Sequence, residues 1–249
     1  MTALIVSTSY NAGEYIERCV QSILDQTEED MRAVCLMDGS EDNSFEKACA
    51  LTDGQERITT VYSANNEGTH SAQKRAISLL NPEPDDLLVY LDGDDAFYCA
   101  DAVEYVMNVY AKRPDLLLTY GSYVPVPFET TSAPAALYPE KCRRNRDYRK
   151  ATRYGHCFNH LRTMKFKLYD AIPKEYTCWP DGSPLMEAAD AAEMTAALEM
   201  AGDNYRFIEK ILVAYNSANP ISDWRRNPRG INKAHAYVES LPKLDVKEF

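Results

Sequence analysis

The chain has 249 residues, of which 45% are hydrophobic and 26% charged, with a net charge of -11 and a mean hydropathy of -0.45. These values are typical of a soluble globular protein with room for one large α/β domain. They argue against a transmembrane segment, because no apolar run of about 18 residues occurs, and against general nucleic-acid binding, which favours a basic surface.

The cysteines and the N-terminus bear on the cellular compartment. The seven cysteines form no CxxC pattern, which is typical of free thiols in a reducing environment. The N-terminus has no basic region ahead of its apolar residues, so it is read as a strand rather than as a signal peptide. We therefore predict a cytoplasmic protein.

Strands and helices alternate along the first 112 residues. Apolar, β-branched runs of strand length are followed by segments with apolar residues at helical spacing. Strands are predicted at residues 3–8, 32–38, 57–63 and 86–92, and helices at 14–26, 44–52, 69–80 and 100–112. This alternation predicts a Rossmann-like α/β fold, with a mainly parallel central sheet and flanking helices.

The pattern changes in the second half of the chain. We predict a strand at 116–124, a long loop over 125–158, helices over 160–172 and 186–202, and a strand at 205–216. A loop of that length is typical of a functional lid. We expect a single domain over residues 1–249, composed of an N-terminal half (1–124) and a C-terminal half (125–249).

Polar residues cluster directly after each of the first four predicted strands. The clusters are Ser7-Thr8, Asp38-Gly39-Ser40, Asn66-Glu67-Gly68 and Asp92-Gly93-Asp94-Asp95. Because the carboxyl ends of parallel strands line the ligand crevice of an open α/β sheet, these clusters predict one shared binding site.

The aspartates of the last cluster need a positive partner. Asp92 and Asp94 would point to the same side if the strand continued through them, because side chains alternate along a strand. Two such carboxylates suit a hard divalent cation, Mn²⁺ or Mg²⁺. The alternative is an acidic turn that caps the helix starting near Ala100.

Basic residues are concentrated in one segment of this acidic chain. Residues 141–167 carry ten lysines and arginines and one acid, Asp147. Such a segment can attract an anionic or lipid-linked ligand, and it leaves room for a peripheral membrane contact. A solvated loop and helix face would have the same composition.

Four motifs together resemble family 2 glycosyltransferases with the GT-A fold. They are SYNAGEYIERCVQSILDQT, MDGSEDNS, NNEGTHSAQKRAI and VYLDGDDAF, in that order within residues 1–124. The resemblance implies a metal-dependent, inverting transfer of a sugar from a nucleotide-diphospho-sugar. The donor would be a UDP-sugar and the acceptor a hydroxyl of a saccharide, glycoprotein or lipid-linked glycan.

The resemblance also implies roles for individual residues. Nucleotide-sugar binding falls to Ser7, Thr8, Tyr10, Asp38, Gly39, Ser40, Asn66, Gly68, Lys74, Asp92 and Gly93. Asp38 would accept a hydrogen bond from the uracil N–H, and Asp94 would hold the cation with Asp92, with His160 as a candidate third ligand. One departure is that Gln73 stands where the family has arginine, with Lys74 next to it.

For the second half, the resemblance implies a general base at the start of the helix predicted over 186–202. Asp190 matches best; Glu187, Glu193 and Asp181 are alternatives. Other candidates for acceptor or phosphate contacts are Arg162, Thr163 and Trp179, and more weakly the run Trp224-Arg225-Arg226.

Two rival functions are considered. A sugar nucleotidylyltransferase would carry a glycine-rich N-terminal loop with a basic residue, and STSYNAGEY has neither. A non-catalytic nucleotide- or glycan-binding relative would keep Asp38 and lack the base.

Overall fold

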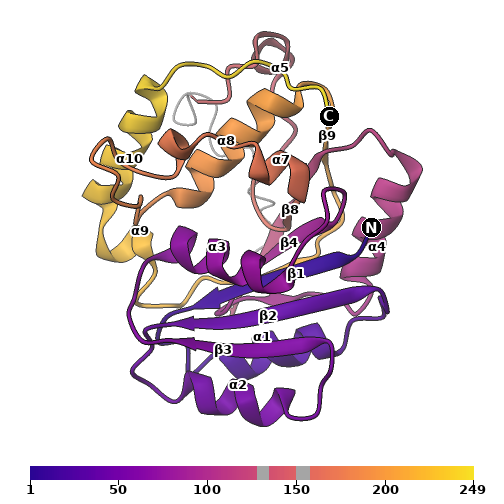
Figure 1. Ribbon diagram of the computed structural model, residues 1–249, viewed down its shortest axis with the longest axis vertical. Helices are drawn as coiled ribbons and strands as arrows, with labels where there is room; N and C mark the ends of the chain where they lie inside the picture. The colour runs from indigo at the N-terminus through magenta and orange to yellow at the C-terminus, as the bar shows by residue number, and fades with distance from the viewer. Residues whose placement is uncertain (128–134, 150–157) are drawn as a thin grey trace.

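A seven-stranded, mainly parallel sheet is the centre of the computed structural model, which describes residues 1–127, 135–149 and 158–249 (Figure 1). Its strand order is β3-β2-β1-β4-β8-β6-β9, and only β8 runs antiparallel to its neighbours. The strands are β1 (Ala3–Ser9), β2 (Met31–Asp38), β3 (Ile58–Ser63), β4 (Leu87–Asp92), β6 (Leu118–Tyr120), β8 (Arg162–Lys165) and β9 (Tyr205–Phe207).

Helices cover both faces of this sheet, as Figure 1 shows for α1 and α2 on one side and α3 and α8 on the other. In β1, Ala3 and Ile5 join one apolar core, and Leu4 and Val6 join the core on the opposite face. Burial on both faces explains the nearly continuous apolar runs of the central strands. The longer helices are α1 (Ile16–Leu24), α2 (Ser44–Thr52), α3 (Thr69–Leu80), α4 (Ala102–Lys112), α8 (Ala189–Ala201) and α10 (Pro228–Ser240).

The carboxyl ends of three adjacent strands lie level with one another. In the parallel register, Ser9 of β1 pairs with Met37 of β2, and Thr8 pairs with Asp92 of β4. The chain leaves β1 toward β2 and β3 on one side and returns as β4 on the other. A binding crevice is expected at such a switch point.

A second, three-stranded sheet has the order β5-β10-β7. It contains β5 (Ala96–Phe97), β7 (Tyr123–Val126) and β10 (Val213–Asn216). Because β5 follows the aspartate cluster directly, its pairing with β10 brings a C-terminal segment next to these aspartates. The remaining short helical segments are α5 (Glu140–Asn145), α7 (Phe166–Asp170), the 3₁₀ helix η1 (Lys174–Tyr176) and α9 (Asp223–Arg226).

Four predictions for the second half differ from the structure. The helix predicted over 160–172 is strand β8 followed by the short helix α7. The strands predicted at 116–124 and 205–216 are each divided between the two sheets, as β6 and β7 and as β9 and β10. The predicted loop over 125–158 contains α5, and its residues 128–134 and 150–157 lie outside the described part of the chain.

The prediction for 186–202 is nearly right, because α8 begins at Ala189 and ends just before Gly202. In the described ranges, no helix combines the length and the apolar character needed to cross a membrane. The six cysteines described are all free thiols.

Candidate active site

A cavity of about 940 Å³ opens at the carboxyl ends of β1, β2 and β4. Its other walls come from the start of α8, the segment after β10, and α9 and α10. The cavity brings together twelve of the residues singled out in the sequence: Thr8, Tyr10, Asp38, Asn66, Gly68, Asp92, Asp94, His160, Arg162, Glu187, Asp190 and Arg226. Residues more than 180 positions apart thus share one site.

Asp38, the last residue of β2, is fixed by the loop that follows β3. Its carboxylate accepts hydrogen bonds from the backbone N–H groups of Glu67, at 3.0 and 3.1 Å, and Gly68, at 2.9 Å. Burial raises the pKa of Asp38, and these two hydrogen bonds oppose the rise. The side chain is rigid and has lone pairs left to accept a further N–H from the cavity.

Four predicted residues lie just behind the cavity lining. Ser7 is buried 3.5 Å from the sulfur of Cys19, and the Ser40 hydroxyl accepts a hydrogen bond from the Asn11 N–H at 3.0 Å. A Cβ atom on Gly39 would lie 2.3 Å from the Asn66 nitrogen, and one on Gly93 would lie 2.4 Å from the Ser9 Cβ. Here the two glycines are required by close backbone packing.

Three other predicted residues lie away from the cavity. Lys74 is exposed on α3, whereas its neighbour Gln73 is buried. Thr163 is fully buried on β8 and shares a 2.7 Å hydrogen bond with the Thr119 hydroxyl. Trp179 packs against Tyr237, with ring centroids 5.0 Å apart. None of the three is among the residues that line the cavity.

The aspartate cluster forms a turn, not the strand extension that would place Asp92 and Asp94 side by side. β4 ends at Asp92, and the Asp95 N–H donates to the Asp92 carbonyl at 2.9 Å. The turn sends Asp94 toward Asn219, whose amide donates to Asp94 Oδ2 at 2.6 Å. It sends Asp95 toward the interior, where Oδ1 accepts the Asn216 N–H at 2.7 Å.

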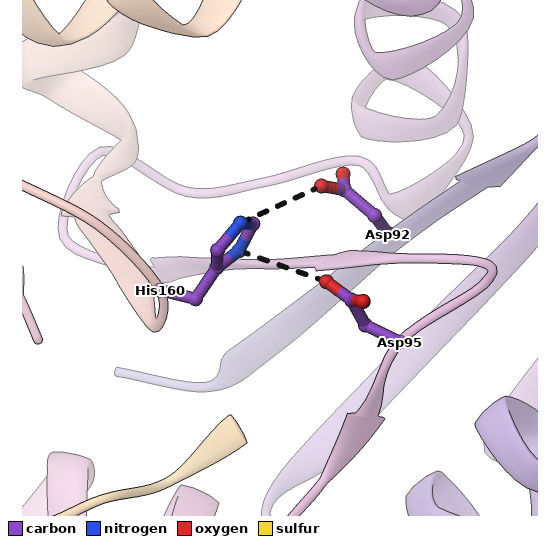
Figure 2. A group of neighbouring side chains, drawn as sticks. All are labelled: Asp92, Asp95 and His160. Carbon is purple, nitrogen blue, oxygen red and sulfur yellow. Dashed lines mark ion pairs between the residues drawn. The ribbon is translucent and has the colours of Figure 1, made fainter. Parts of the chain in front are cut away.

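The His160 imidazole faces both Asp92 and Asp95, as Figure 2 shows. Its Nε2 is 4.0 Å from Asp92 Oδ2, and its Nδ1 is 3.9 Å from Asp95 Oδ2. Neither the His160 Nδ1 nor the Asp95 Oδ2 has a hydrogen-bond partner among the described residues. Each of the three residues offers a ligand atom within 4.8 Å of the other two, so the group could hold a metal ion.

The environment shifts the pKa values of this group in opposite directions. Burial, with the Arg162 charge adding to it, lowers the pKa of His160 to about 4, so the imidazole is neutral at pH 7. Burial raises the pKa of Asp95 well above its usual range, and the charges of Asp94 and Asp92 add to the rise. A divalent cation beside these aspartates would offset that negative charge.

Arg162 is a positive partner of Asp92 within the protein itself, in addition to the divalent cation that the sequence predicts. Its guanidinium, almost fully buried, lies 3.5 Å from Asp92 Oδ2 and 3.3 Å from Asp190 Oδ2. The strand β8 places it there by pairing beside β4, with Arg162 opposite Tyr90. Arg162 therefore connects the aspartate turn with the start of α8.

Two of the four candidate bases line the cavity. Asp190 lies in the first turn of α8 with its carboxylate half exposed, and Glu187 lies just before the helix, with Oε1 accepting the Asn227 amide at 2.5 Å. Asp181 is instead held in an exposed turn by Ser183, and Glu193 is buried beside His70. Neither of these two is among the lining residues.

Sequence reasoning missed most of the C-terminal wall of the cavity. Asn219, Asn227, Ile231 and His235 line it, together with Arg226, which the sequence had singled out. The polar stretch before α10 gave little hydrophobic signal. The Pro228 at the first helical position, preceded by an Asn cap, was the feature that could have located this helix.

The basic segment 141–167 is divided among several places. Arg143, Arg144 and Arg146 surround a separate hollow beside Gly202, at the far end of α8. The 13-residue length of α8 puts this hollow roughly 20 Å from Asp190. Other cations of the segment are paired with acids: Arg149 with the buried Glu199, and Lys165 and Lys167 with the exposed Asp85.

Residues 4–172 match the sequence profile of glycosyl transferase family 2. The chain therefore belongs to glycosyl transferase family 2, and the predicted fold class and family are confirmed.

Particular relatives match parts of the chain. Over 112 residues it is 34% identical to chondroitin synthase and to hyaluronan synthase of Pasteurella multocida, a stretch that is 45% of this chain and 11% of each synthase. The fold is similar to S. aureus TarS 1-349, with a TM-score of 0.67 at 14% identity, over 96% of this chain and 64% of that one. The chain is thus much shorter than these relatives. TarS 1-349 has also been solved in complex with UDP and with UDP-GlcNAc.

Proposed function

We propose that this protein is a cation-dependent, inverting glycosyltransferase that moves a sugar from a UDP-sugar to a hydroxyl of a saccharide or glycoconjugate. The observation that carries the proposal is the position of Arg162 between Asp92 and Asp190 in one cavity. Inversion needs a base on one side of the sugar and a departing diphosphate on the other. Asp190 would lie on the side of the base and Asp92 on the side of the diphosphate, with the Arg162 guanidinium between them.

The donor nucleotide would bind at the ends of β1 and β2. Asp38, as a fixed hydrogen-bond acceptor, suits the N–H of uracil, while Thr8, Tyr10, Asn66 and Gly68 line the same part of the cavity. The solved complexes of the similarly folded TarS with UDP and UDP-GlcNAc support a UDP-sugar as the donor.

The residues beside the donor site fit a divalent cation. His160 Nε2 and Asp92 Oδ2 lie 4.0 Å apart at the cavity wall, and the oxygen ligands of Asp92 and Asp94 suit Mn²⁺ or Mg²⁺. We assign the cation to Asp92, Asp94 and His160, which line the cavity. When bound, the cation stabilises the negative charge on the departing diphosphate.

Asp190 would act as the base. Its carboxylate accepts the proton of the acceptor hydroxyl while that oxygen bonds to the anomeric carbon, and the electron pair of the broken bond leaves with UDP. Glu187 is the alternative base, although the Asn227 amide already occupies one of its oxygens. The names of the Pasteurella relatives, chondroitin synthase and hyaluronan synthase, support a saccharide acceptor.

The first test is thermal stabilisation by UDP, GDP, dTDP and CDP, each with and without Mn²⁺. A ligand at about 100 times its Kd adds about 2.7 kcal/mol of stability, so selective stabilisation by UDP with Mn²⁺ is expected. Stabilisation by another nucleotide would reassign the donor. The absence of any response would contradict the proposal.

The second test separates an enzyme from a non-catalytic binding relative. UDP release from UDP-sugars is measured for the wild type, Asp190→Asn and Glu187→Gln, with Asp181→Asn as the control outside the cavity. We expect kcat of Asp190→Asn to fall by about 10²- to 10⁴-fold, with UDP binding retained. Wild-type protein that binds UDP and releases none from any UDP-sugar would favour the binding relative.

A further inference from the structure

We propose that Asp95 is a positioning residue that orients the His160 imidazole so that its Nε2 faces the cation site. Asp95 has no role in the proposed function, in which Asp92, Asp94 and His160 hold the cation. The inference rests on that proposed cation, and it explains why a fully buried carboxylate lies directly behind the site.

The geometry places the two nitrogens of His160 toward different carboxylates. Nδ1 is 3.9 Å from Asp95 Oδ2, and Nε2 is 4.0 Å from Asp92 Oδ2. Figure 2 shows one ring nitrogen toward each aspartate. Asp95 and His160 are 0% and 8% exposed, and the facing atoms Oδ2 and Nδ1 lack any other partner among the described residues.

A neutral imidazole carries its proton on one nitrogen and a lone pair on the other. The positive charge of a bound cation favours the ionised form of Asp95, and a carboxylate facing Nδ1 favours the ring proton on that nitrogen. The lone pair of Nε2 is then directed at Asp92 and the cavity. Only that tautomer can give Nε2 to a metal, and metal-binding histidines usually donate their other N–H to a carboxylate or carbonyl. The 3.9 Å separation exceeds a hydrogen bond, so we expect the ring to move toward Asp95 when the cation binds.

Asp95 is placed to act through His160 rather than as a ligand. It is not among the residues that line the cavity, whereas Asp92 and His160 are. Its other oxygen is anchored by the Asn216 N–H at 2.7 Å. This anchor comes from the end of β10, so the C-terminal segment fixes the carboxylate that in turn orients the histidine.

The test is a double-mutant cycle on Mn²⁺ affinity, measured by electron paramagnetic resonance on protein without substrate. Asp95→Asn keeps the side-chain shape and an oxygen for the Asn216 N–H. Its amide nitrogen then faces Nδ1 and donates to it, which moves the ring proton to Nε2. We expect the Mn²⁺ Kd to rise by about 10- to 100-fold. In a His160→Ala background the same change should alter Kd by no more than about twofold.

Asp86→Asn is the matched control, because Asp86 is also a buried aspartate. It accepts hydrogen bonds from the backbone N–H groups of Thr2 and Glu83. Its Mn²⁺ affinity should equal that of the wild type, and circular dichroism checks that each variant is folded. If Asp95→Asn does not fold, Asp95→Ala removes the charge without adding a donor, and we expect its Mn²⁺ Kd to rise by about tenfold.

The outcomes distinguish this inference from the function on which it rests. Additive losses in the cycle would make Asp95 a direct ligand and overturn the positioning role alone. Unchanged Mn²⁺ affinity in folded Asp95→Asn would overturn it as well. Wild-type protein that does not bind Mn²⁺, alone or with UDP, would overturn both the cation proposed above and the role of Asp95.

Discussion

Arg162 and Asp190 form an ion pair of 3.3 Å across the cavity, between a buried guanidinium on β8 and a half-exposed carboxylate at the start of α8. The other end of the same guanidinium lies 3.5 Å from Asp92. A planar fork can serve two carboxylates at once, and this geometry is not available to a lysine ammonium. Arg162 therefore holds the proposed base and the proposed donor site in a fixed relation.

Arg162→Lys tests this relation. The substitution keeps the positive charge and loses the fork, so one of the two carboxylates loses its partner. We expect kcat to fall by about 10²-fold, the scale measured for removing one well-placed electrostatic contact, while UDP affinity changes little. Steady-state kinetics of UDP release would measure this. Arg113→Lys, at an exposed pair with Asp115, is the control, and equal kcat values for both variants would contradict the role of Arg162.

Arg149 and Glu199 form a buried ion pair that ties the C-terminal tail to α8. Their atoms are 2.6 and 2.7 Å apart in a two-bond arrangement, and Glu199 also accepts the Leu244 N–H at 2.9 Å. Removing one partner leaves a buried charge unpaired, at a cost of roughly 3–5 kcal/mol. We expect Arg149→Met to lower the free energy of unfolding by about that amount in urea titrations.

Arg144→Met provides the comparison, because Arg144 pairs with Glu140 on the surface of α5, where both side chains are more than two-thirds exposed. Exposed pairs contribute about 0–1 kcal/mol, so little change is expected. Equal effects of the two substitutions would show that the burial of Arg149 does not determine its contribution.

The first half of the fold was predictable because its central strands are buried on both faces. Such strands have continuous apolar runs in the sequence. The strand β8 was not, since Arg162 and Lys165 look like residues of an exposed helix. Both are buried in β8. Arg162 is paired with Asp92 and Asp190, and Lys165 with the Pro114 carbonyl and Asp85. Only the tertiary pairing with β4 and β6 reveals this.

The site residues at the strand ends could be predicted from the sequence. The positions of side chains in the turn after β4 could not. The sequence located Asp92 and His160 in a common site but placed Asp94, not Asp95, beside Asp92. The local turn at Gly93 decides this arrangement, and it is stabilised by Asn216 and by Asn219, more than 120 residues away. No local pattern encodes a contact of that range.

Gly39 tests the support of the proposed nucleotide site. It has a positive φ of 69°, and a Cβ there would lie 2.3 Å from the Asn66 nitrogen, in the loop that holds Asp38. Gly39→Ala should displace this loop and raise the Kd for UDP by about tenfold or more, the equivalent of about 1.4 kcal/mol, as measured by calorimetry. Gly54→Ala is the matched control, because Gly54 has a similar φ of 73° and open space around its Cβ position.

Both substitutions carry the cost of a positive φ for alanine, about 1–2 kcal/mol, so both should lower the thermal stability. Only Gly39→Ala should also weaken UDP binding. A loss of UDP affinity in both variants would attribute the effect to general destabilisation rather than to the loop beside Asp38.

Asp42 makes the stability of the fold depend on pH, in a direction that follows from its hydrogen bonds. Its carboxylate accepts the Gly13 N–H at 2.7 Å and the Ser44 hydroxyl at 2.6 Å. Burial raises the pKa of Asp42, but the hydrogen bonds from Ser44 and Gly13 outweigh burial and bring the pKa below its ordinary value. A pKa that is lower in the folded state than in the unfolded state means that the ionised group stabilises the fold.

This stabilisation is present above the unfolded-state pKa of about 3.9 and is lost as the pH falls through the folded-state pKa. We therefore expect Asp42→Asn to be less stable than the wild type at about pH 7, with a gap that narrows below about pH 4 as the wild-type carboxylate takes up its proton. Urea titrations at both pH values measure the gap. Glu41→Gln, at the exposed neighbouring acid, is the control. Its free energy of unfolding should change between the two pH values by the same amount as that of the wild type. A gap that stays constant with pH would mean that Asp42 acts through its shape rather than through its charge.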